Sequence, residues 1–205
     1  MWENLSEIWK AAFEEAWEAF KSGSIPIGAV ITDKSGNILL KDHNRSSESG
    51  IINRSISHAE ANALRNLDTS EYNPRSLTLY STMEPCPMCF GTAVMANIKR
   101  LRYAARDPHC GFVHIKDEDA YLRSKNLDYC FENDEKELVQ LTIQSYHELR
   151  YISMGGGDGV LNKFRLLNGK AVGIAERLFA ERKLDSLAES GESLGTVYDL
   201  ISSAE

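Results

Sequence analysis

Two short motifs constrain the fold of this chain more than any other feature. The first is His-Ala-Glu at residues 58–60, and the second is Pro-Cys-Pro-Met-Cys at residues 85–89. One imidazole and two thiolates, from His58, Cys86 and Cys89, form a ligand set that suits zinc and leaves its fourth coordination position open. We therefore expect the chain to fold so that the two motifs meet at one zinc ion per chain.

The spacing within each motif indicates where these residues lie. Two cysteines three positions apart at the start of a helix direct both sulfurs at one ion, and the helix dipole favours their ionised form. His58 and Glu60 diverge in the middle of a helix but converge if His58 opens one, because side chains there lean toward the N-terminus. The motifs therefore predict two helix N-termini at one metal, with Glu60 as the catalytic proton shuttle that metal-assisted hydrolysis needs.

The order His-x-Glu followed by Pro-Cys-x-x-Cys resembles the signature of the zinc-dependent nucleobase and nucleoside deaminases, the cytidine/deoxycytidylate deaminase-like superfamily. The surrounding matches are Pro-Ile-Gly-Ala-Val at 26–30, His-Asn-Arg at 43–45, Leu-Tyr-Ser-Thr-Met-Glu at 79–84 and Ala-Ala-Arg-Asp at 104–107. They resemble the branch that holds bacterial tRNA adenosine deaminases, guanine deaminases and fungal-type cytosine deaminases. The resemblance implies a three-layer α/β/α fold around a mixed five-stranded sheet, with a helical C-terminal extension beyond the pattern.

The same resemblance implies which residues hold the substrate. It places the Asn44 side chain and the backbone around Ala59 and Pro85 against the ring. Asp107 falls in the segment that resembles the substrate-strand loop of the tRNA enzymes. Glu84, next to Pro85, could be taken for a second catalytic carboxylate, but its position before a proline favours a buried, hydrogen-bonded structural acid.

Hydrophobic patterning supports an α/β fold. The expected strands are residues 27–32, 38–40, 77–83, 98–105 and 128–131, and the main expected helices are residues 4–21, 58–67, 86–97 and 135–151. A short helix at 118–123 between the last two strands allows them to run parallel through a crossover connection. This arrangement is typical of the purine and cytosine branch.

The chain divides into two parts. Residues 1–150 are expected to form the zinc-dependent deaminase domain, and residues 151–205 form an extension that opens with the glycine-rich segment 155–159. The extension has too few apolar residues for an independent core, so we expect it to pack on the domain or on a partner subunit. It would act there either as a lid over the substrate or as a cover for an apolar face.

Composition narrows the location and the partners. The chain has 205 residues and a net charge of −7, a field that repels polyanions such as RNA. No apolar stretch approaches the length of a membrane span, and the acidic first residues do not resemble a secretory signal. Cys110 and Cys130 are most simply free thiols. We therefore expect a cytoplasmic protein with no membrane partner.

Three functions remain open from the sequence. The first is a deaminase of a free nucleobase or nucleoside. It is favoured by the acidic net charge and by the sequence of the 85–89 motif, which resembles that of guanine deaminases. The alternative is a tRNA adenosine deaminase, favoured by Ala105-Arg106-Asp107. The third is a catalytically inactive structural partner subunit, against which the presence of Glu60 argues. A homodimer paired through the helices near the zinc ligands is expected from the resemblance.

Overall fold

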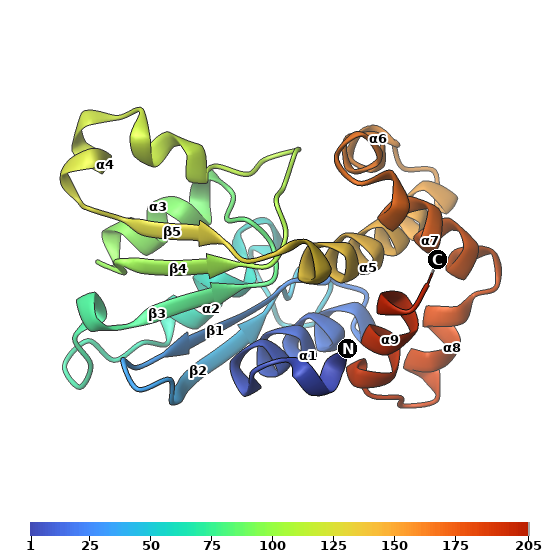
Figure 1. Ribbon diagram of the computed structural model, residues 1–205, viewed down its shortest axis with the longest axis horizontal. Coiled ribbons are helices and arrows are strands. Elements are labelled where there is room, and N and C mark those ends of the chain that lie inside the picture. The colour runs from blue at the N-terminus through green and yellow to red at the C-terminus, as the bar shows by residue number, and fades with distance from the viewer. Residues whose placement is uncertain (205) are drawn as a thin grey trace.

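A mixed five-stranded sheet forms the centre of the computed structural model, which describes residues 1–204 (Figure 1). The strands are β1 (Gly28–Thr32), β2 (Ile38–His43), β3 (Thr78–Ser81), β4 (Arg100–Tyr103) and β5 (Asp128–Phe131), in the order β2-β1-β3-β4-β5. Strand β1 runs antiparallel to β2 and β3, whereas β3, β4 and β5 are parallel to one another. The predicted sheet and its parallel last pair are confirmed.

Alternating side chains on β1 build the two cores on opposite faces of the sheet. Ala29 and Ile31 are fully buried in a core shared with α2 (Ala59–Arg65) and α3 (Pro87–Met95). Val30 points to the other face and joins a core with α1 (Glu7–Lys21) and α5 (Asp134–Ser153). This period of two is what a strand buried on both faces requires, and it produces the three layers.

The first helix begins later than its hydrophobic pattern predicts. Residues Trp2–Asn4 form a 3₁₀ turn, η1, and the Ser6 hydroxyl accepts a hydrogen bond from the Trp9 amide at 3.4 Å. Ser6 is therefore the N-cap, because its side chain satisfies an amide that has no partner inside the helix. Further 3₁₀ turns lie at η2 (Arg54–Ile56), η3 (Pro74–Ser76) and η4 (Val113–Asp117), and α4 (Ala120–Ser124) precedes β5.

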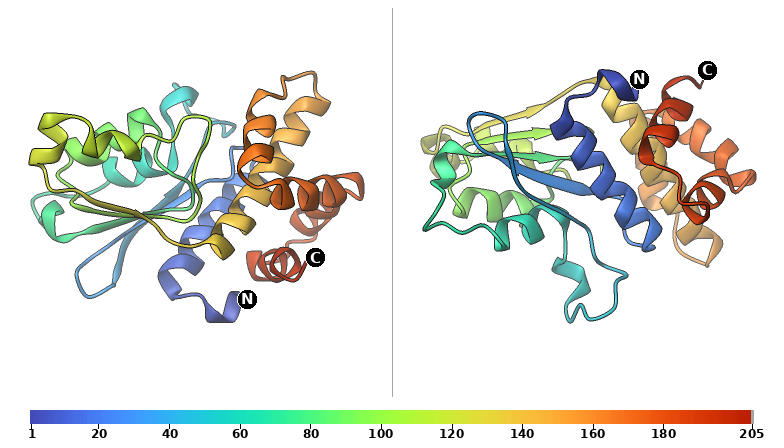
Figure 2. Two further views of the ribbon diagram at one scale, coloured as in Figure 1. Left: turned by 45° about the horizontal axis from the view of Figure 1, so that its top comes forward. Right: turned by 90° about the horizontal axis from the view of Figure 1, so that it is seen from below.

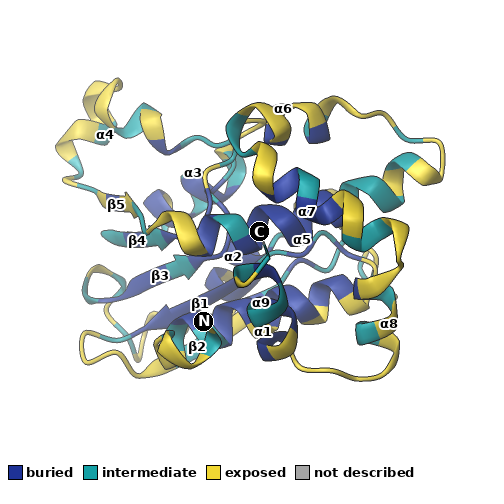
Figure 3. Ribbon diagram, turned by 45° about the vertical axis from the view of Figure 1, so that its right-hand side comes forward, coloured by how far each residue is buried: buried dark blue, intermediate teal, exposed yellow. Residues whose placement is uncertain are grey.

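Four helices follow α5 and pack beside it. They are α6 (Gly159–Leu167), α7 (Gly169–Ala180), α8 (Lys183–Glu189) and α9 (Leu194–Ser202), and they gather on one side of the sheet domain (Figure 1). Figure 3 shows that α7 and α1 bury their inward sides, whereas exposed residues follow the outer side of α6 and α8. Helix α5 continues through residue 150, so the division into 1–150 and 151–205 stays a prediction.

The C-terminal helices share the core of the domain. Tyr198 on α9 is fully buried, and its ring meets that of Phe13 on α1 edge to face, with centroids 5.4 Å apart. The Trp17 indole donates a hydrogen bond to the Glu192 carbonyl at 2.9 Å. The extension is therefore held by aromatic packing against α1, in addition to its contacts with α5.

The N-terminal turn η1 lies against α9, the last helix of the described chain (Figure 2). The Trp2 amide donates a hydrogen bond to Asp199 Oδ1 at 2.7 Å, and the Trp2 ring lies 5.8 Å from that of Tyr198. Among residues 1–204, no helix combines the length and the apolar character that crossing a membrane needs.

Candidate active site

The two motifs meet at the N-termini of two helices, as their spacing predicts. His58 is the N-cap of α2, Cys86 is the N-cap of α3, and Cys89 lies in the first turn of α3. His58 Nδ1 is 3.5 Å from Cys86 Sγ and 3.6 Å from Cys89 Sγ, and the three ligand atoms all lie within 4.8 Å of one another. Two helix N-termini thus converge on one point.

The spacing of these atoms suits zinc. Sulfur and nitrogen ligands at their usual zinc distances, in tetrahedral directions, are separated by roughly 3.6 Å. Hydrogen bonds from Cys89 and His58 outweigh the effect of burial and lower the pKa of the Cys86 thiol to about 4. Cys86 therefore favours the thiolate, the form that binds the metal, whereas its hydrogen bond to Cys86 and burial raise the pKa of Cys89, which has to lose its proton on metal binding. The spacing of His58, Cys86 and Cys89 therefore fits a zinc ion.

Glu60 lies in the first turn of α2 next to this site, and its carboxyl group is in hydrogen-bonding contact with Cys89. It is only 3% exposed, and the Ser81 hydroxyl at the end of β3 donates a hydrogen bond to its Oε1 at 3.3 Å. Burial raises the pKa of Glu60 above its ordinary value, because a charged carboxylate loses its hydration there. A carboxyl group with a raised pKa can both accept and return a proton near neutral pH.

A cavity of about 250 Å³ opens beside the ligands, and His58, Glu60 and Cys86 form part of its wall. Asn44, 1% exposed, also lines it. The Oδ1 atom of Asn44 accepts a hydrogen bond from the Ser46 amide at 2.9 Å. That contact fixes the orientation of the side-chain amide, and the NH₂ group of Asn44 remains available to a ring nitrogen or oxygen.

The other predicted substrate residues occupy different positions. Ala59 is fully buried at the start of α2, and the Pro85 carbonyl accepts a hydrogen bond from the Phe112 amide at 3.0 Å. Neither side chain lines the cavity, whereas Asp107 does. Asp107 Oδ1 accepts hydrogen bonds from the backbone amides of His109 and Cys110, at 2.8 and 3.2 Å, so part of this carboxylate holds its own loop in shape.

Glu84 acts as the structural acid that its position before Pro85 predicts. Its carboxylate accepts hydrogen bonds from the Asp107 amide at 3.2 Å and the Val113 amide at 3.1 Å. The loop approaches so closely that a Cβ atom at Gly111 would lie 2.6 Å from Glu84 Oε2. Glu84 therefore fixes the loop that carries Asp107 to the cavity.

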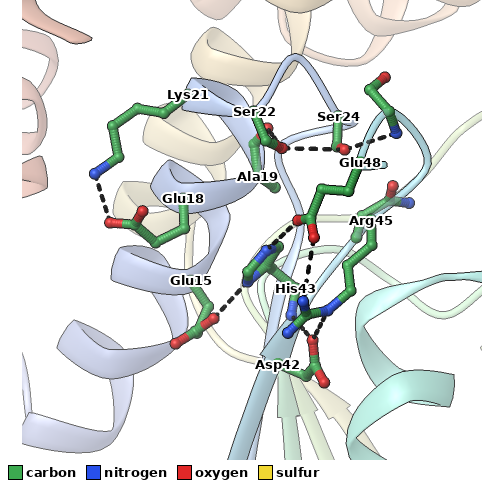
Figure 4. Close-up of polar contacts among 12 residues, drawn as sticks. Glu15, Glu18, Ala19, Lys21, Ser22, Ser24, Asp42, His43, Arg45 and Glu48 are labelled. Atoms are coloured by element: carbon green, nitrogen blue, oxygen red, sulfur yellow. Dashed lines mark hydrogen bonds and ion pairs between the residues drawn. The ribbon is translucent and has the colours of Figure 1, made fainter. Parts of the chain in front are cut away.

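The residue before Asn44 is clamped between two carboxylates (Figure 4). His43 Nδ1 lies 2.7 Å from Glu15 Oε2 on α1, and His43 Nε2 lies 2.7 Å from Glu48 Oε1 in the following loop. Burial lowers the pKa of His43, but the hydrogen bonds to Glu15 and Glu48 outweigh it and raise that pKa above its ordinary 6.5. Both ring nitrogens donate only in the charged form, so the clamp requires a protonated ring.

The clamp makes stability depend on pH. Because the pKa of His43 is raised in the folded state, its contribution is complete below about pH 6.5 and is lost as the pH rises through the folded value. Lys41 also pairs with Glu15, and Arg45 also pairs with Glu48. We expect the urea midpoint of unfolding to fall as the pH rises above about 6.5.

His43→Gln should flatten this dependence. His114→Gln, at an exposed histidine, is the matched control and should leave the pH dependence as in the parent chain. A parent-like fall in the midpoint of His43→Gln between neutral and alkaline pH would contradict the role of the clamp.

The far wall of the cavity is formed by residues that carry no motif. Gln144 and Glu148 on α5, with Val160 and Phe164 on α6, line the cavity opposite the motifs, and we call these four residues the α5–α6 wall. The sequence predicts only that the extension acts as a lid over the substrate or as a cover for an apolar face. The polar pair four residues apart on one face of α5 does not distinguish a cavity wall from a solvated helix surface, so no local signal identifies these residues.

Comparison with known proteins agrees with this geometry. Residues 2–105 match the family described as "Cytidine and deoxycytidylate deaminase zinc-binding region". The tRNA-specific adenosine deaminase of Bacillus subtilis (strain 168) is 39% identical over 107 residues, which cover 50% of this chain and 62% of that protein. The protein of the same name from Rickettsia felis is 35% identical over 124 residues, covering 58% of this chain and 80% of that protein.

A solved structure is also similar to this chain in sequence and in fold. It comes from work described as "Biochemical and Structural Studies of A-to-I Editing by tRNA:A34 Deaminases at the Wobble Position of Transfer RNA". The two chains are 29% identical with a TM-score of 0.53, and the match covers 61% of this chain and 96% of the other. The family match, the paired motifs and the shared fold agree, and the chain belongs to the cytidine and deoxycytidylate deaminase family through its zinc-binding region.

Proposed function

We propose that this protein is a zinc-dependent hydrolytic deaminase, which replaces an exocyclic amine of a nucleobase with oxygen and releases ammonia. The observation that carries the proposal is the meeting of His58, Cys86 and Cys89 beside the buried Glu60 in one cavity. Three ligands with an open position and a carboxyl group that is not a ligand are the arrangement that this chemistry uses.

Each residue has a distinct role in the proposed reaction. When bound, zinc supplies a Lewis acid that makes water acidic enough to attack near neutral pH. Glu60 accepts the first proton of the attacking water and delivers it to the ring nitrogen, and it then carries the second proton, from the newly added hydroxyl, to the departing amine as the C–N bond breaks. The NH₂ group of Asn44 holds the base by donating to an acceptor on the ring. Water adds its oxygen to the ring carbon, and the amine leaves as ammonia.

The substrate that we propose is adenosine in tRNA. The sequence reading favoured a free nucleobase or nucleoside, but both reported relatives carry the name tRNA-specific adenosine deaminase at 39% and 35% identity. The solved structure, from work on tRNA:A34 deaminases, supports the same choice. Asp107 follows Ala105 and Arg106 in the segment that resembles the substrate-strand loop of those enzymes.

A free nucleobase or nucleoside is the second candidate, and the charges near the cavity favour it. Arg102 pairs with Asp128 at 2.7 Å, and Arg106 pairs with Glu137 at 2.6 Å. These pairs neutralise two of the cations on β4 and directly after it, which leaves fewer unpaired charges there for a phosphate backbone. The net charge of −7 acts in the same direction.

Ammonia release separates the two candidates. The zinc-loaded chain is incubated with adenine, guanine, cytosine, their nucleosides and, in a separate arm, unmodified tRNA. We expect release from tRNA, with inosine in the digested RNA. Turnover confined to free bases or nucleosides would favour the second candidate, and no release in any arm would contradict deaminase function.

We also propose a homodimer. Exposed apolar residues lie over α2, α3 and the turn before them, with Met95 72% exposed and Ile56 42% exposed. A shallow depression of about 500 Å³ between them is lined by Ala61, Leu64 and Met88, among others. Burying this surface against a second copy would remove apolar area from water. Light scattering at micromolar concentration should report twice the chain mass, and the mass of one chain would contradict pairing.

A further inference from the structure

The α5–α6 wall presents a polar side and an apolar side to the cavity. Gln144 and Glu148 are four residues apart on α5, so they share one face of the helix, and Val160 and Phe164 have the same spacing on α6. All four lie outside residues 2–105, the segment that matches the family. Part of the cavity wall is therefore built by a segment of the chain that the family match does not cover.

Gln144 is buried with one hydrogen-bonding atom unused. It is 5% exposed, and within residues 1–204 its Oε1 atom has no hydrogen-bond partner. Its side chain donates to the carboxylate of Glu148. Buried polar atoms are nearly always paired in proteins, and an unpaired one is costly. The Oε1 atom is buried within the wall and does not face the cavity, so keeping Gln144 in this position is costly.

The carboxyl group of Glu148 can accept hydrogen bonds, and it lies in a partly buried environment. Burial raises the pKa of Glu148 most, the hydrogen bond from Gln144 opposes this, and the negative charge of Asp107 adds to the rise. Asp107 and Glu148 both line the cavity, so two carboxyl groups act on whatever binds there. A phosphate group would be repelled by this pair, whereas N–H and O–H groups would be attracted.

The volume limits what can enter. The cavity of about 250 Å³ is slightly smaller than the roughly 300 Å³ at which pockets for drug-sized molecules begin. It suits one base with part of its sugar, and any phosphate must stay outside. The Phe164 ring and Val160 offer apolar contact to a planar group, while Glu148 offers the acceptor beside it.

We propose that Glu148, oriented by Gln144, is a specificity-determining residue that accepts a hydrogen bond from an N–H or O–H group of the substrate, on the side remote from the reacting amine. This inference rests on the proposed deaminase function. Gln144 is a positioning residue, which fixes the Glu148 carboxylate through its amide. The α5–α6 wall thereby selects substrates by a hydrogen-bond donor that Glu60 does not contact.

Steady-state kinetics of the zinc-loaded full chain test the proposal. The substrates are the one that the parent chain turns over best in the ammonia assay and its analogues that lack one donor, such as adenosine, 2′-deoxyadenosine and adenine. Glu148→Gln should raise KM about 10- to 100-fold for the substrate with the donor, as expected for loss of a charged hydrogen bond, with kcat changed less than threefold. An analogue that lacks the donor should lose little from the same substitution.

Gln144→Leu separates positioning from structural support. This substitution of similar size removes the amide, so KM should rise in the same direction while the melting temperature is unchanged or higher. A lower melting temperature with parental KM would show a purely structural role and overturn the proposal. Glu118→Gln, an exposed carboxyl group outside the cavity, is the matched control and should behave as the parent chain.

Two outcomes distinguish failure of the inference from failure of the proposed function. Equal kcat/KM for the parent chain and Glu148→Gln on every active substrate would overturn the role of Glu148 and leave deaminase function intact. If no substrate releases ammonia, the deaminase proposal fails, and calorimetric binding of adenosine decides the role of the wall. A tenfold or larger loss of affinity in Glu148→Gln would support it, and unchanged or undetectable binding in both proteins would overturn it.

Discussion

Glu60→Gln should lower kcat by roughly 10²- to 10⁴-fold while zinc content and melting temperature stay at parental values. Glutamine keeps the size of the side chain and an oxygen for the Ser81 hydroxyl, but it cannot take up a proton. Because the substitution removes no metal ligand, its effect falls on the chemical step. Ammonia-release kinetics, elemental analysis and thermal melting of the same sample measure kcat, zinc content and melting temperature.

Glu84→Gln is the control for this experiment, because Glu84 lines the same cavity but holds the loop through two backbone amides. It should lower the melting temperature, whereas Glu60→Gln should not. If Glu60→Gln retained more than a tenth of the parental kcat, another group would have to move the protons.

Cys86→Ser should lose zinc and, with it, stability. Serine keeps the position of the side chain but is a far weaker zinc ligand than a thiolate. A metal that binds only the folded state stabilises it by about 4 kcal/mol when free zinc exceeds its Kd 1,000-fold. The zinc-loaded parent chain should therefore unfold at a clearly higher temperature than Cys86→Ser, as measured by calorimetry with elemental analysis.

A chelator separates this effect from loss of packing. Excess chelator should bring the parent chain down to the melting temperature of Cys86→Ser. A difference that persisted in chelator would mean that the thiol stabilises the protein by packing alone. Cys130→Ser, at an exposed cysteine away from the cavity, should change neither zinc content nor melting temperature.

The part of the site that was predictable from the sequence is the part that chemistry restricts to a few residue types. His58, Cys86 and Cys89 could be assigned because zinc accepts few side chains and because the start of a helix fixes their directions. The sheet was predictable because its strands are covered by helices on both faces and therefore appear in the sequence as hydrophobic runs. The start of α1 was less certain, since its pattern predicts a helix from residue 4, whereas residues 2–4 form a 3₁₀ turn and Ser6 is the N-cap.

The α5–α6 wall could not be predicted for a physical reason. Gln144 and Glu148 are ordinary surface residues by type, and only the packing of α6 and α7 against α5 turns them inward. That packing depends on contacts between segments far apart in the chain, which leave no local pattern. Substrate selection in this protein thus depends on residues whose setting is decided by tertiary structure alone.

The pairing of α9 with α1 has a consequence for folding during synthesis. Phe13 and Trp17 on α1 are covered by Tyr198 and by the segment around Glu192, contacts that span most of the chain. Until residues 194–202 emerge from the ribosome, the apolar face of α1 is incompletely covered and open to association with other chains. Contacts of such long sequence separation also slow the search for the native state. A nascent chain stalled before α9 should therefore depend on chaperones that bind exposed apolar helices.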